Sequence, residues 1–551
     1  MSDLLVSYTA LSPSSSRSEV SKILTLIINA LPWTVNNSTR AKLIEVLLND
    51  LKKRGPESRL TNQDAAKGLL AVKTLGKKPE GAEQLATAFG FSTLLALAVE
   101  LKDDVEASSE ALRCIANTLL LFDQSRTLFI TEEVGGGEIC VKALNECTHP
   151  DQIFVLARIL FFATVTPSPF VVSLVEKEHE GQNISDIIGS KLDLMLVELP
   201  KDVKMAKEAI ADLLKLTFNI LLHYPKLVEC EPQSSSASED SSKIMGDFWS
   251  SKLNGFILPL LRVYQGLPVS KPTPLVSPLT NAIHCLITIP VNESVRDLWF
   301  GTDSNQAPDV VARTRDLIDE CFALYFPKKK SPDDSSVRDY ARSLHPDDEL
   351  DDILSPLVML LTRLCLGNAS TRQRILDWTV PPDLDRDPER PLDERPTFLG
   401  RCLRLMGSVY HRRLKDAVGE MLYIMCGEDA GVLCSKVGYG HVAGFLFEKG
   451  VMSAPDTNGD DKGKGKEQEN EDEEADNSEM TFANPETRQI NPITGTYVPD
   501  KTSNPADDMS EEEKEREMEK LFVLFDRMEK TGALQPEQNP VRKAIQKSMQ
   551  S

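Results

Sequence analysis

The sequence predicts an all-α protein, an armadillo/HEAT-like α-solenoid superhelix, and three observations support this fold class. First, nearly every segment from Ser18 to Gly450 places its apolar residues with a helical period. Second, the alternating patterns and tight Asn-Gly or Asp-Gly turns that are typical of strands are scarce. Third, similar apolar helices recur at 110–122, 212–224 and 278–290, as expected for stacked units of roughly 40–47 residues. A non-repetitive helical domain is the alternative.

Composition narrows the class of partner. The chain has 551 residues, a formal charge of -22 and 41% hydrophobic residues, which is ample for a long array with a core. The acidic balance argues against nucleic acid and anionic membrane surfaces as partners, since both attract basic patches. Ten cysteines without a C-x-x-C pair indicate reduced core thiols of a cytoplasmic protein.

No targeting or membrane segment is expected. The N-terminal residues lack a basic region followed by an apolar one, so they do not resemble a signal peptide. The longest apolar stretch, from Phe154 to Val175, is interrupted by Arg158 and two prolines. We therefore expect no integral membrane segment.

Changes in composition suggest three regions. We expect a helical repeat domain over residues 1–452, an acidic disordered linker over 453–489 and a tail over 490–551. Ser-rich, charged and Pro-rich stretches indicate insertions near 229–243, 327–342 and 380–396. The linker carries eight carboxylates between Glu467 and Glu479 and no basic residue there, so it cannot offset its chain entropy by burial.

The tail contains a predicted amphipathic helix over 510–531. Ser510 and Glu513 form a capping box, and acidic residues crowd the first turn, where the helix dipole favours them. One apolar stripe follows the helix: Met518, Leu521, Phe522, Phe525 and Met528. A helix of this kind beyond a disordered linker must bury its stripe against something.

No constellation for covalent chemistry is visible. The sequence VGGGE at 134–138 is not followed by G-K-[ST], so it is interpreted as a connector rather than a phosphate loop. His179 is expected in solvent, and Asp416 with Glu420 is expected on a solvated helix face. The sequence therefore predicts a protein that works by binding, is not an enzyme, and needs no cofactor or metal.

The C-terminal third is more specific. LKDAVGEMLYIMCGEDA (414–430), VGYGHVAGFLFEKGVM (437–452), INPITG (490–495) and a helix at 509–532 follow in this order, with the acidic run between the second and third. This set resembles the synembryn family, the resistance-to-inhibitors-of-cholinesterase proteins, and in particular its fungal members. The asparagine-bearing helices at 110–122 and 212–224 resemble that family's N-terminal repeats.

The resemblance implies a partner, the heterotrimeric G-protein α subunit (Gα). It implies binding of the GDP-bound or nucleotide-free form, promotion of GDP release, dissociation on GTP binding, and a role as folding chaperone for new α subunits. In the family the concave face holds the C-terminal helix of Gα and the tail helix reaches the switch region. A cytoplasmic monomer is implied, at the cell cortex or plasma membrane through Gα. A generic solenoid scaffold or transport adaptor, and a chaperone without exchange activity, are the alternatives.

Several residues become candidates for partner binding. In the repeats we select Asn117, Phe218 and Asn219, and in the tail Leu521, Phe522 and Phe525. Arg113, one turn before Asn117, could meet a carboxylate of Gα, but a solvated arginine is the favoured interpretation. Ordinary core packing is the alternative for Phe218, and a side-chain-to-backbone hydrogen bond is the alternative for the asparagines. The tail residues could instead pack on the last repeat of the chain itself.

INPITG is interpreted as an anchor that pins the tail to the solenoid. Asn491 and Pro492 form a rigid turn, Gly495 releases it, and Ile490 and Ile493 fill a small apolar hollow. An incidental apolar turn is the alternative.

The family is regulated by phosphorylation of its acidic segment, which makes Thr457 and Ser478 candidate sites. Thr457 has an acidic residue three positions later, as does Ser236, whereas Ser478 and Thr481 lie nearest the acidic run but lack one. A phosphate there could tie the tail to basic solenoid residues.

Overall fold

The computed structural model describes residues 3–31, 34–228, 249–301, 309–327, 330–451, 490–491 and 494–497. The chain divides into two compact units, of which the first comprises residues 1–385, 390–467 and 492–495 and the second the remainder. In the described residues all regular elements are helical, and this confirms the predicted all-α class. The predicted linker and the predicted helix over 510–531 lie outside the described residues.

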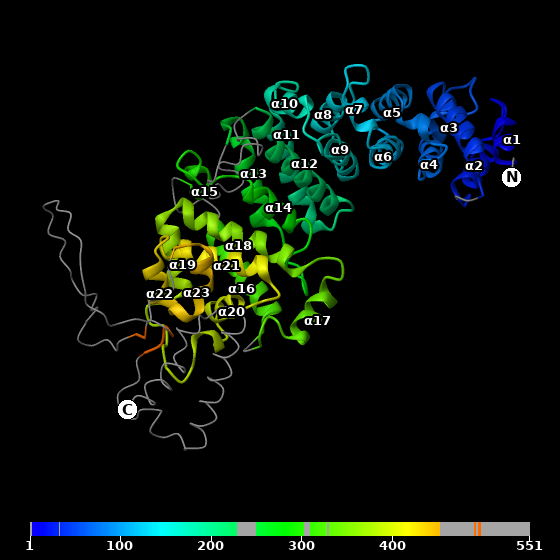
Figure 1. The fold of residues 1–551 in the computed structure, drawn as a ribbon. Helices are drawn as coiled ribbons and strands as arrows, with labels where there is room; N and C mark the ends of the chain where they lie inside the picture. Colours follow the sequence, from blue (N-terminus) through cyan, green and yellow to red (C-terminus); the bar gives the residue numbers. More distant parts are fainter. Residues whose placement is uncertain are drawn as a thin grey trace, which may run out of the picture. The chain divides into compact units, whose positions relative to one another are not determined.

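Eight helices of the first unit form one row, here called row A, in which each helix packs on the next (Figure 1). Row A consists of α2 (Arg17–Ile28), α4 (Ala65–Leu75), α6 (Val105–Leu121), α9 (Pro150–Ala163), α12 (Ala206–Leu227), α14 (Leu279–Ile287), α18 (Leu350–Gly367) and α21 (Arg412–Met425). The predicted recurring helices are α6, α12 and α14, so the internal likeness marks members of one row.

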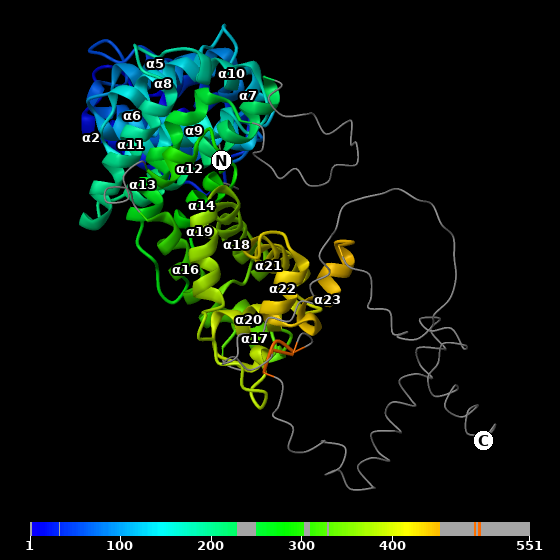
Figure 2. The ribbon, with the colours of Figure 1, turned by 90° about the vertical axis from the view of Figure 1, so that its left-hand side faces the viewer.

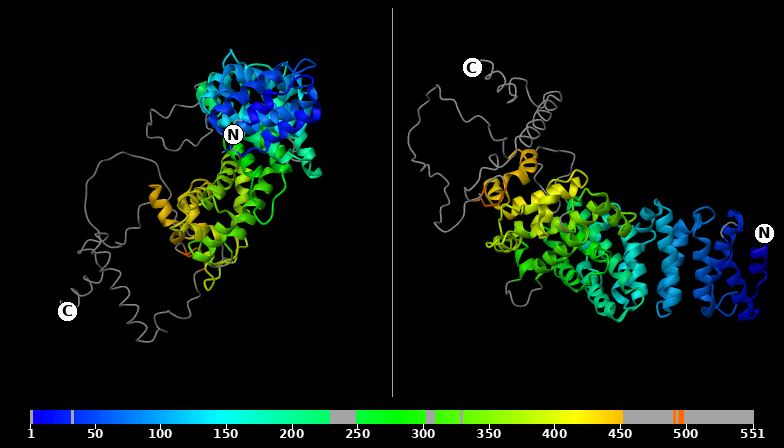
Figure 3. Two further views of the ribbon diagram at one scale, coloured as in Figure 1. Left: turned by 90° about the vertical axis from the view of Figure 1, so that its right-hand side faces the viewer. Right: turned by 90° about the horizontal axis from the view of Figure 1, so that it is seen from below.

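A second row, row B, covers the first, and each of its helices packs on a row-A helix. Row B consists of α3 (Asn37–Lys52), α5 (Ala88–Glu100), α8 (Gly136–Glu146), α11 (Ile184–Glu198), α13 (Ile257–Gly266), α16 (Val310–Tyr325), α20 (Phe398–Met406) and α23 (Tyr439–Glu448). The right panel of Figure 3 shows the N-terminal helices (blue to cyan) side by side in chain order. Stacked helix pairs of this kind make the first unit an α-solenoid.

Further helices lie outside the two rows, and Figure 2 shows α17 and α19 beside the later row members. They are α1 (Asp3–Thr9), α7 (Ser125–Phe129), α10 (Pro169–Glu176), α15 (Arg296–Phe300), α17 (Ser335–Leu344), α19 (Ala369–Thr379) and α22 (Ala430–Val437). Short 3₁₀ helices are η1 (Asn62–Asp64), η2 (Glu83–Ala86), η3 (Leu199–Lys201), η4 (Ser251–Phe256) and η5 (Leu392–Glu394).

Hydrogen bonds of one recurring type, here called stitching bonds, connect successive helices of row A. A polar side chain on one helix donates to a main-chain carbonyl of the preceding row-A helix or of the turn that ends it. The bonds are Cys114 Sγ to Leu69 O (3.6 Å), Asn219 Nδ2 to Phe161 O (3.1 Å), Cys285 Sγ to Leu214 O (3.1 Å) and Arg363 to Ile289 O (3.2 Å). Because the four donors are buried, each bond satisfies a group that would otherwise destabilise the interface between repeats.

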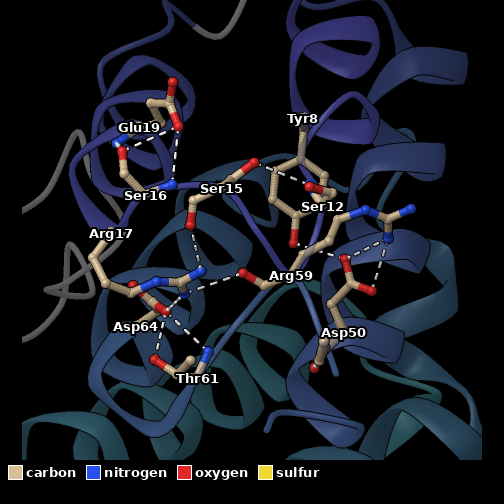
Figure 4. Close-up of polar contacts among 11 residues, drawn as sticks. Tyr8, Ser12, Ser15, Ser16, Arg17, Glu19, Asp50, Arg59, Thr61 and Asp64 are labelled. Atoms are coloured by element: carbon tan, nitrogen blue, oxygen red, sulfur yellow. Dashed lines mark hydrogen bonds and ion pairs between the residues drawn. The ribbon is translucent and has the colours of Figure 1, made fainter. Parts of the chain in front are cut away.

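Two buried carboxylates close the N-terminal end of the array (Figure 4). Asp50 of α3 accepts hydrogen bonds from the Tyr8 hydroxyl and from Arg59, each at 2.9 Å. Burial raises the pKa of Tyr8, so its hydroxyl stays protonated and donates. Asp64 accepts from Arg17 at 2.5 Å and from the main-chain N–H of Thr61 at 2.9 Å. These contacts tie α1 and α2 to the α3–α4 connection.

The structure corrects two local predictions. The polar stretch near 327–342 contains a helix, α17, because Asp334 caps it by accepting from the Ser336 N–H at 2.8 Å. His179, expected in solvent, is only 7% exposed. A tight turn folds it back, so that Nε2 lies 3.2 Å from Leu174 O and Nδ1 lies 3.2 Å from the Glu138 carboxylate. The Pro-rich stretch at 380–396 holds only the turn η5, in agreement with its prolines.

The glycines at 135–137 begin a helix. Gly135 has a left-handed backbone (φ 61°) and precedes α8. A Cβ on Gly136 would lie 2.4 Å from the Phe129 ring, and one on Gly137 would lie 2.3 Å from the Phe170 ring. The glycines therefore serve close packing between α7, α8 and α10, and they form no phosphate loop.

Candidate partner-binding surface

Charged side chains connect the consecutive row-A helices α4, α6 and α9. Lys73 of α4 lies 2.5 Å from Glu110 of α6, which also pairs with Arg113 at 3.0 Å. Arg113 in turn pairs with Asp151 at the start of α9. Two cations meet two anions, so this stretch of the surface is electrically balanced.

The next stretch, between α9 and α12, is unbalanced. Asp212 of α12 is almost fully buried, with a side chain 2% exposed, and its two oxygens accept from different cations. Arg158 Nε of α9 lies 2.6 Å from Oδ2, and Lys215 Nζ lies 3.1 Å from Oδ1. The side chains of Arg158 and Lys215 are 40% and 39% exposed. One buried anion thus positions two accessible cations, which leaves one positive charge in excess.

Aromatic rings frame the same two cations. The Arg158 guanidinium lies 4.4 Å from the centre of the Phe154 ring, and the Lys215 ammonium lies 5.9 Å from that of Phe161. Cations held over rings beside apolar surface suit a partner that offers both a carboxylate and apolar side chains. We call Phe154, Arg158, Phe161, Asp212 and Lys215 the Asp212 cluster.

The candidate residues of the repeats lie on the same helices. Asn117 is half-buried on α6, one turn after Arg113. Phe218 is half-buried on α12, and its ring centre lies 6.3 Å from that of His284 on α14. Asn219 is 7% exposed and donates to Phe161 O and to Thr164 Oγ1, each at 3.1 Å. Asn219 therefore makes the side-chain-to-backbone bond that was the structural alternative, which leaves it little surface for a partner.

Sequence reasoning did not select Arg158, Asp212 or Lys215. In the sequence, Arg158 stands out only as an interruption of an apolar stretch, and Asp212 only as the first residue of a recurring helix. A charged residue inside an apolar run must find a partner, since an unpaired buried charge is strongly destabilising. The charge at Arg158 therefore indicates that an acidic partner exists. Residue spacing could not identify that partner, because Asp212 lies 54 residues further along the chain.

The anchor sequence INPITG is described in part, since Pro492 and Ile493 lie outside the described residues. In the first unit, Gly495 has φ 70° and packs on the main chain at the end of α22. A Cβ there would lie 2.7 Å from the Val437 carbonyl carbon and oxygen. Glycine is therefore required at this contact both for its backbone conformation and for its lack of a side chain.

The second unit holds the neighbouring residues of the anchor. The Asn491 N–H donates to Thr496 O at 2.7 Å, and Ile490 and Tyr497 form an isolated antiparallel bridge. The Tyr497 N–H donates to Arg386 O at 2.7 Å. Ile490 is 40% exposed, so it does not fill the apolar hollow that the sequence suggested.

The remaining candidates lie outside the described residues. They are Leu521, Phe522 and Phe525 of the tail helix and the phosphorylation candidates Thr457 and Ser478. Within the described ranges, no group of three His, Cys, Asp or Glu side chains is placed to hold a metal ion. Burial raises the pKa of the Cys140 and Cys365 thiols to about 12, so both stay protonated at neutral pH. No described helix is both long and apolar enough to span a bilayer.

The fold and this surface define a class, a helical-repeat protein that presents an ordered row of charged and aromatic side chains. Comparison with known sequences is more specific, because the profile of the Ric8 family, described as guanine nucleotide exchange factor synembryn, matches residues 68–549. The chain belongs to this family, whose members are exchange factors and chaperones.

Curated relatives agree with this assignment. The chain is 23% identical over 439 residues to Chaperone Ric-8 of Drosophila pseudoobscura pseudoobscura, covering 78% of this chain and 70% of the relative. It is 23% identical over 539 residues to Chaperone ric-8 of Caenorhabditis briggsae, covering 91% and 88%. A shorter match to Chaperone Ric-8A of Xenopus tropicalis is 31% identical over 216 residues, covering 38% and 37%.

Proposed function

We propose that this protein binds Gα subunits in their GDP-bound or nucleotide-free form, promotes GDP release, and assists the folding of new α subunits. It acts by binding and performs no covalent chemistry. It works as a monomer in the cytoplasm and reaches the cell cortex or plasma membrane through Gα.

The Asp212 cluster is the observation that supports this function best. The C-terminal helix of a Gα subunit would lie across row A, with apolar residues on the half-buried rings of Phe161 and Phe218. A carboxylate of that helix would meet the excess cation at Arg158 and Lys215. Because Asp212 already fixes both cations, little side-chain entropy is lost when the partner binds.

Exchange follows from differential affinity. A surface that binds nucleotide-free Gα more tightly than GDP-bound Gα accelerates GDP release. GTP binding then favours a conformer of Gα that dissociates from this protein. The tail, with Leu521, Phe522 and Phe525, would contact the same Gα. Its anchor at Gly495 raises the effective concentration of the tail helix beside the bound partner.

The direct test measures GDP release from a purified Gα subunit with and without this protein. A companion pull-down compares Gα loaded with GDP and with a non-hydrolysable GTP analogue. Faster release, with binding lost in the GTP analogue, is the expected result. Binding without faster GDP release would indicate a chaperone without exchange activity. Absence of binding to any Gα would favour a generic solenoid scaffold.

A matched pair of variants tests the surface. Lys215→Met keeps the apolar stem and the Arg158–Asp212 pair but removes the excess charge. Lys42→Met is the control, because Lys42 also pairs with a carboxylate three residues away but lies on α3 of row B. We expect Lys215→Met to weaken Gα binding by about tenfold and the control to leave it unchanged. If the two variants bind Gα with equal affinity, the Asp212 cluster is not part of the interface with Gα.

A further inference from the structure

An open cleft of about 840 Å³ lies between the row-B helices α5 and α8, apart from the Asp212 cluster. Its walls are Ser92, Ala96 and Val99 on α5, and Ile139 and Ala143 on α8. Leu112 of α6 and Leu156 of α9 form its floor. The cleft is therefore lined by side chains of four helices from two successive repeats.

Small side chains create the cleft. Ser92 and Ala96 stand one helical turn apart on the exposed face of α5, and Ala143 faces them from α8. Residues of larger volume at these positions would fill the space between the two helices. Val99, at the end of the same stripe, keeps 48% of its surface exposed, so apolar area remains accessible along the wall.

Each wall of the cleft follows one helix for about two turns. One wall runs from Ser92 to Val99 and the other from Ile139 to Glu146, and each of these seven-residue steps spans about 10 Å at the rise of an α-helix. Its volume lies within the roughly 300–1,000 Å³ that is typical of small-molecule sites, which are also mostly apolar. Apolar walls and floor of this kind suit an aliphatic chain better than a polar molecule.

Each wall carries a lysine at the mouth. Lys102 follows α5 and pairs with Glu146 at 3.2 Å, and Lys142 of α8 pairs with Glu180 at 2.7 Å. Both lysine side chains are more than half exposed, and exposed ion pairs are weak. A ligand carboxylate can therefore replace Glu146 or Glu180 as the partner of an ammonium group.

We infer that this cleft binds a single aliphatic chain that ends in a carboxylate or a similar polar group. The chain would lie between α5 and α8 on Leu112 and Leu156, with its polar end between Lys102 and Lys142. This inference is independent of Gα binding, because no residue of the Asp212 cluster lines the cleft, although both sites use side chains of α9.

A titration of the full-length protein with a dansyl-labelled long-chain fatty acid tests the inference. Ala96→Phe and Ala143→Phe fill the cleft, and Ala369→Phe is the control at an exposed alanine of α19. We expect wild type and control to bind the probe equally and the two filled variants to bind about tenfold more weakly or not at all. Thermal unfolding of all four proteins establishes that the variants are folded. Unchanged affinity in folded Ala96→Phe and Ala143→Phe would overturn the inference.

Competition identifies the source of the chain. Unlabelled fatty acid and a peptide with an N-terminal acyl group are each added to the probe complex. Displacement by either one supports a site for an aliphatic chain, and the stronger competitor shows whether the chain is bound free or attached to a peptide. Displacement by neither, or equal displacement by the unacylated peptide, would contradict it. Lys215→Met should bind the probe as wild type does, so loss of Gα binding and loss of chain binding are distinguishable.

Discussion

Two regions of the solenoid use the same chemical device for different ends. At the N-terminal end, Asp50 meets one cation, Arg59, and one hydroxyl, and the charges cancel. Between α9 and α12, Asp212 meets two cations whose side chains are each about 40% exposed. A buried carboxylate therefore closes the array where charges balance, and holds two accessible cations at the surface where they do not.

Removal of Asp212 should have the largest effect. In Asp212→Ala, Arg158 and Lys215 lose the anion that holds them. Because both cations are about 40% exposed, water solvates them in part, and we estimate a cost of about 2–3 kcal/mol for the two lost bonds. We expect a lower free energy of unfolding in urea and weaker Gα binding together. A stable variant with full Gα affinity would show that the cluster neither stabilises the repeats nor contacts the partner.

Removal of Asp50 should affect stability alone. In Asp50→Ala the Tyr8 hydroxyl and the partly exposed Arg59 lose their acceptor, which we estimate at about 2 kcal/mol. Urea unfolding should report this loss, while the affinity for Gα should equal that of the wild type. Reduced Gα affinity in a folded Asp50→Ala protein would contradict the contrast between the two regions.

Addition of a single methyl group at Gly495 should destabilise the anchor. Gly495→Ala would add a Cβ 2.7 Å from the Val437 carbonyl at a backbone angle that disfavours alanine, a local cost of about 1–3 kcal/mol. We expect faster proteolysis near residues 490–497, with the melting temperature of the repeats unchanged. Gly444→Ala is a suitable control, because no atom lies within 4 Å of its added Cβ.

The smallest expected effect is a pH dependence that arises beyond the N-terminal region, since residues 1–148 contain no histidine. Burial lowers the pKa of His284, which contacts Phe218, so the native state favours the neutral ring. The unfolded chain binds the proton more readily, and stability should fall as the pH drops below about 6.5. Burial also lowers the pKa of His223, His345 and His441, so His284→Leu should reduce, and not abolish, the pH dependence of the unfolding free energy between pH 7 and pH 5.5. An unchanged slope would exclude His284 as a contributor.

The contrast also shows what a sequence reveals. Local periodicity was sufficient for the helical class and for α6, α12 and α14, because it depends on neighbours within a few turns. The bond of Asn219 was among the alternatives for the same reason, as small polar residues in such helices seek main-chain carbonyls. The Asp212 cluster was missed because Arg158 is 54 residues from its acceptor. The burial of His179 was missed because a tight turn, rather than a helix, determines it.

The stitching bonds of row A affect where a chain of this kind can accept inserted residues. Each stitching bond reaches the row-A helix before it, or the turn after that helix, and none of the four involves a long connection. Helices α4, α6 and α9 begin 40 and 45 residues apart, whereas α12 and α14 begin 73 apart. Extra residues between repeats therefore do not disrupt these hydrogen bonds to main-chain carbonyls. The same tolerance makes the connection between α12 and α14 a natural place to graft a fluorescent or affinity module without disturbing the repeats.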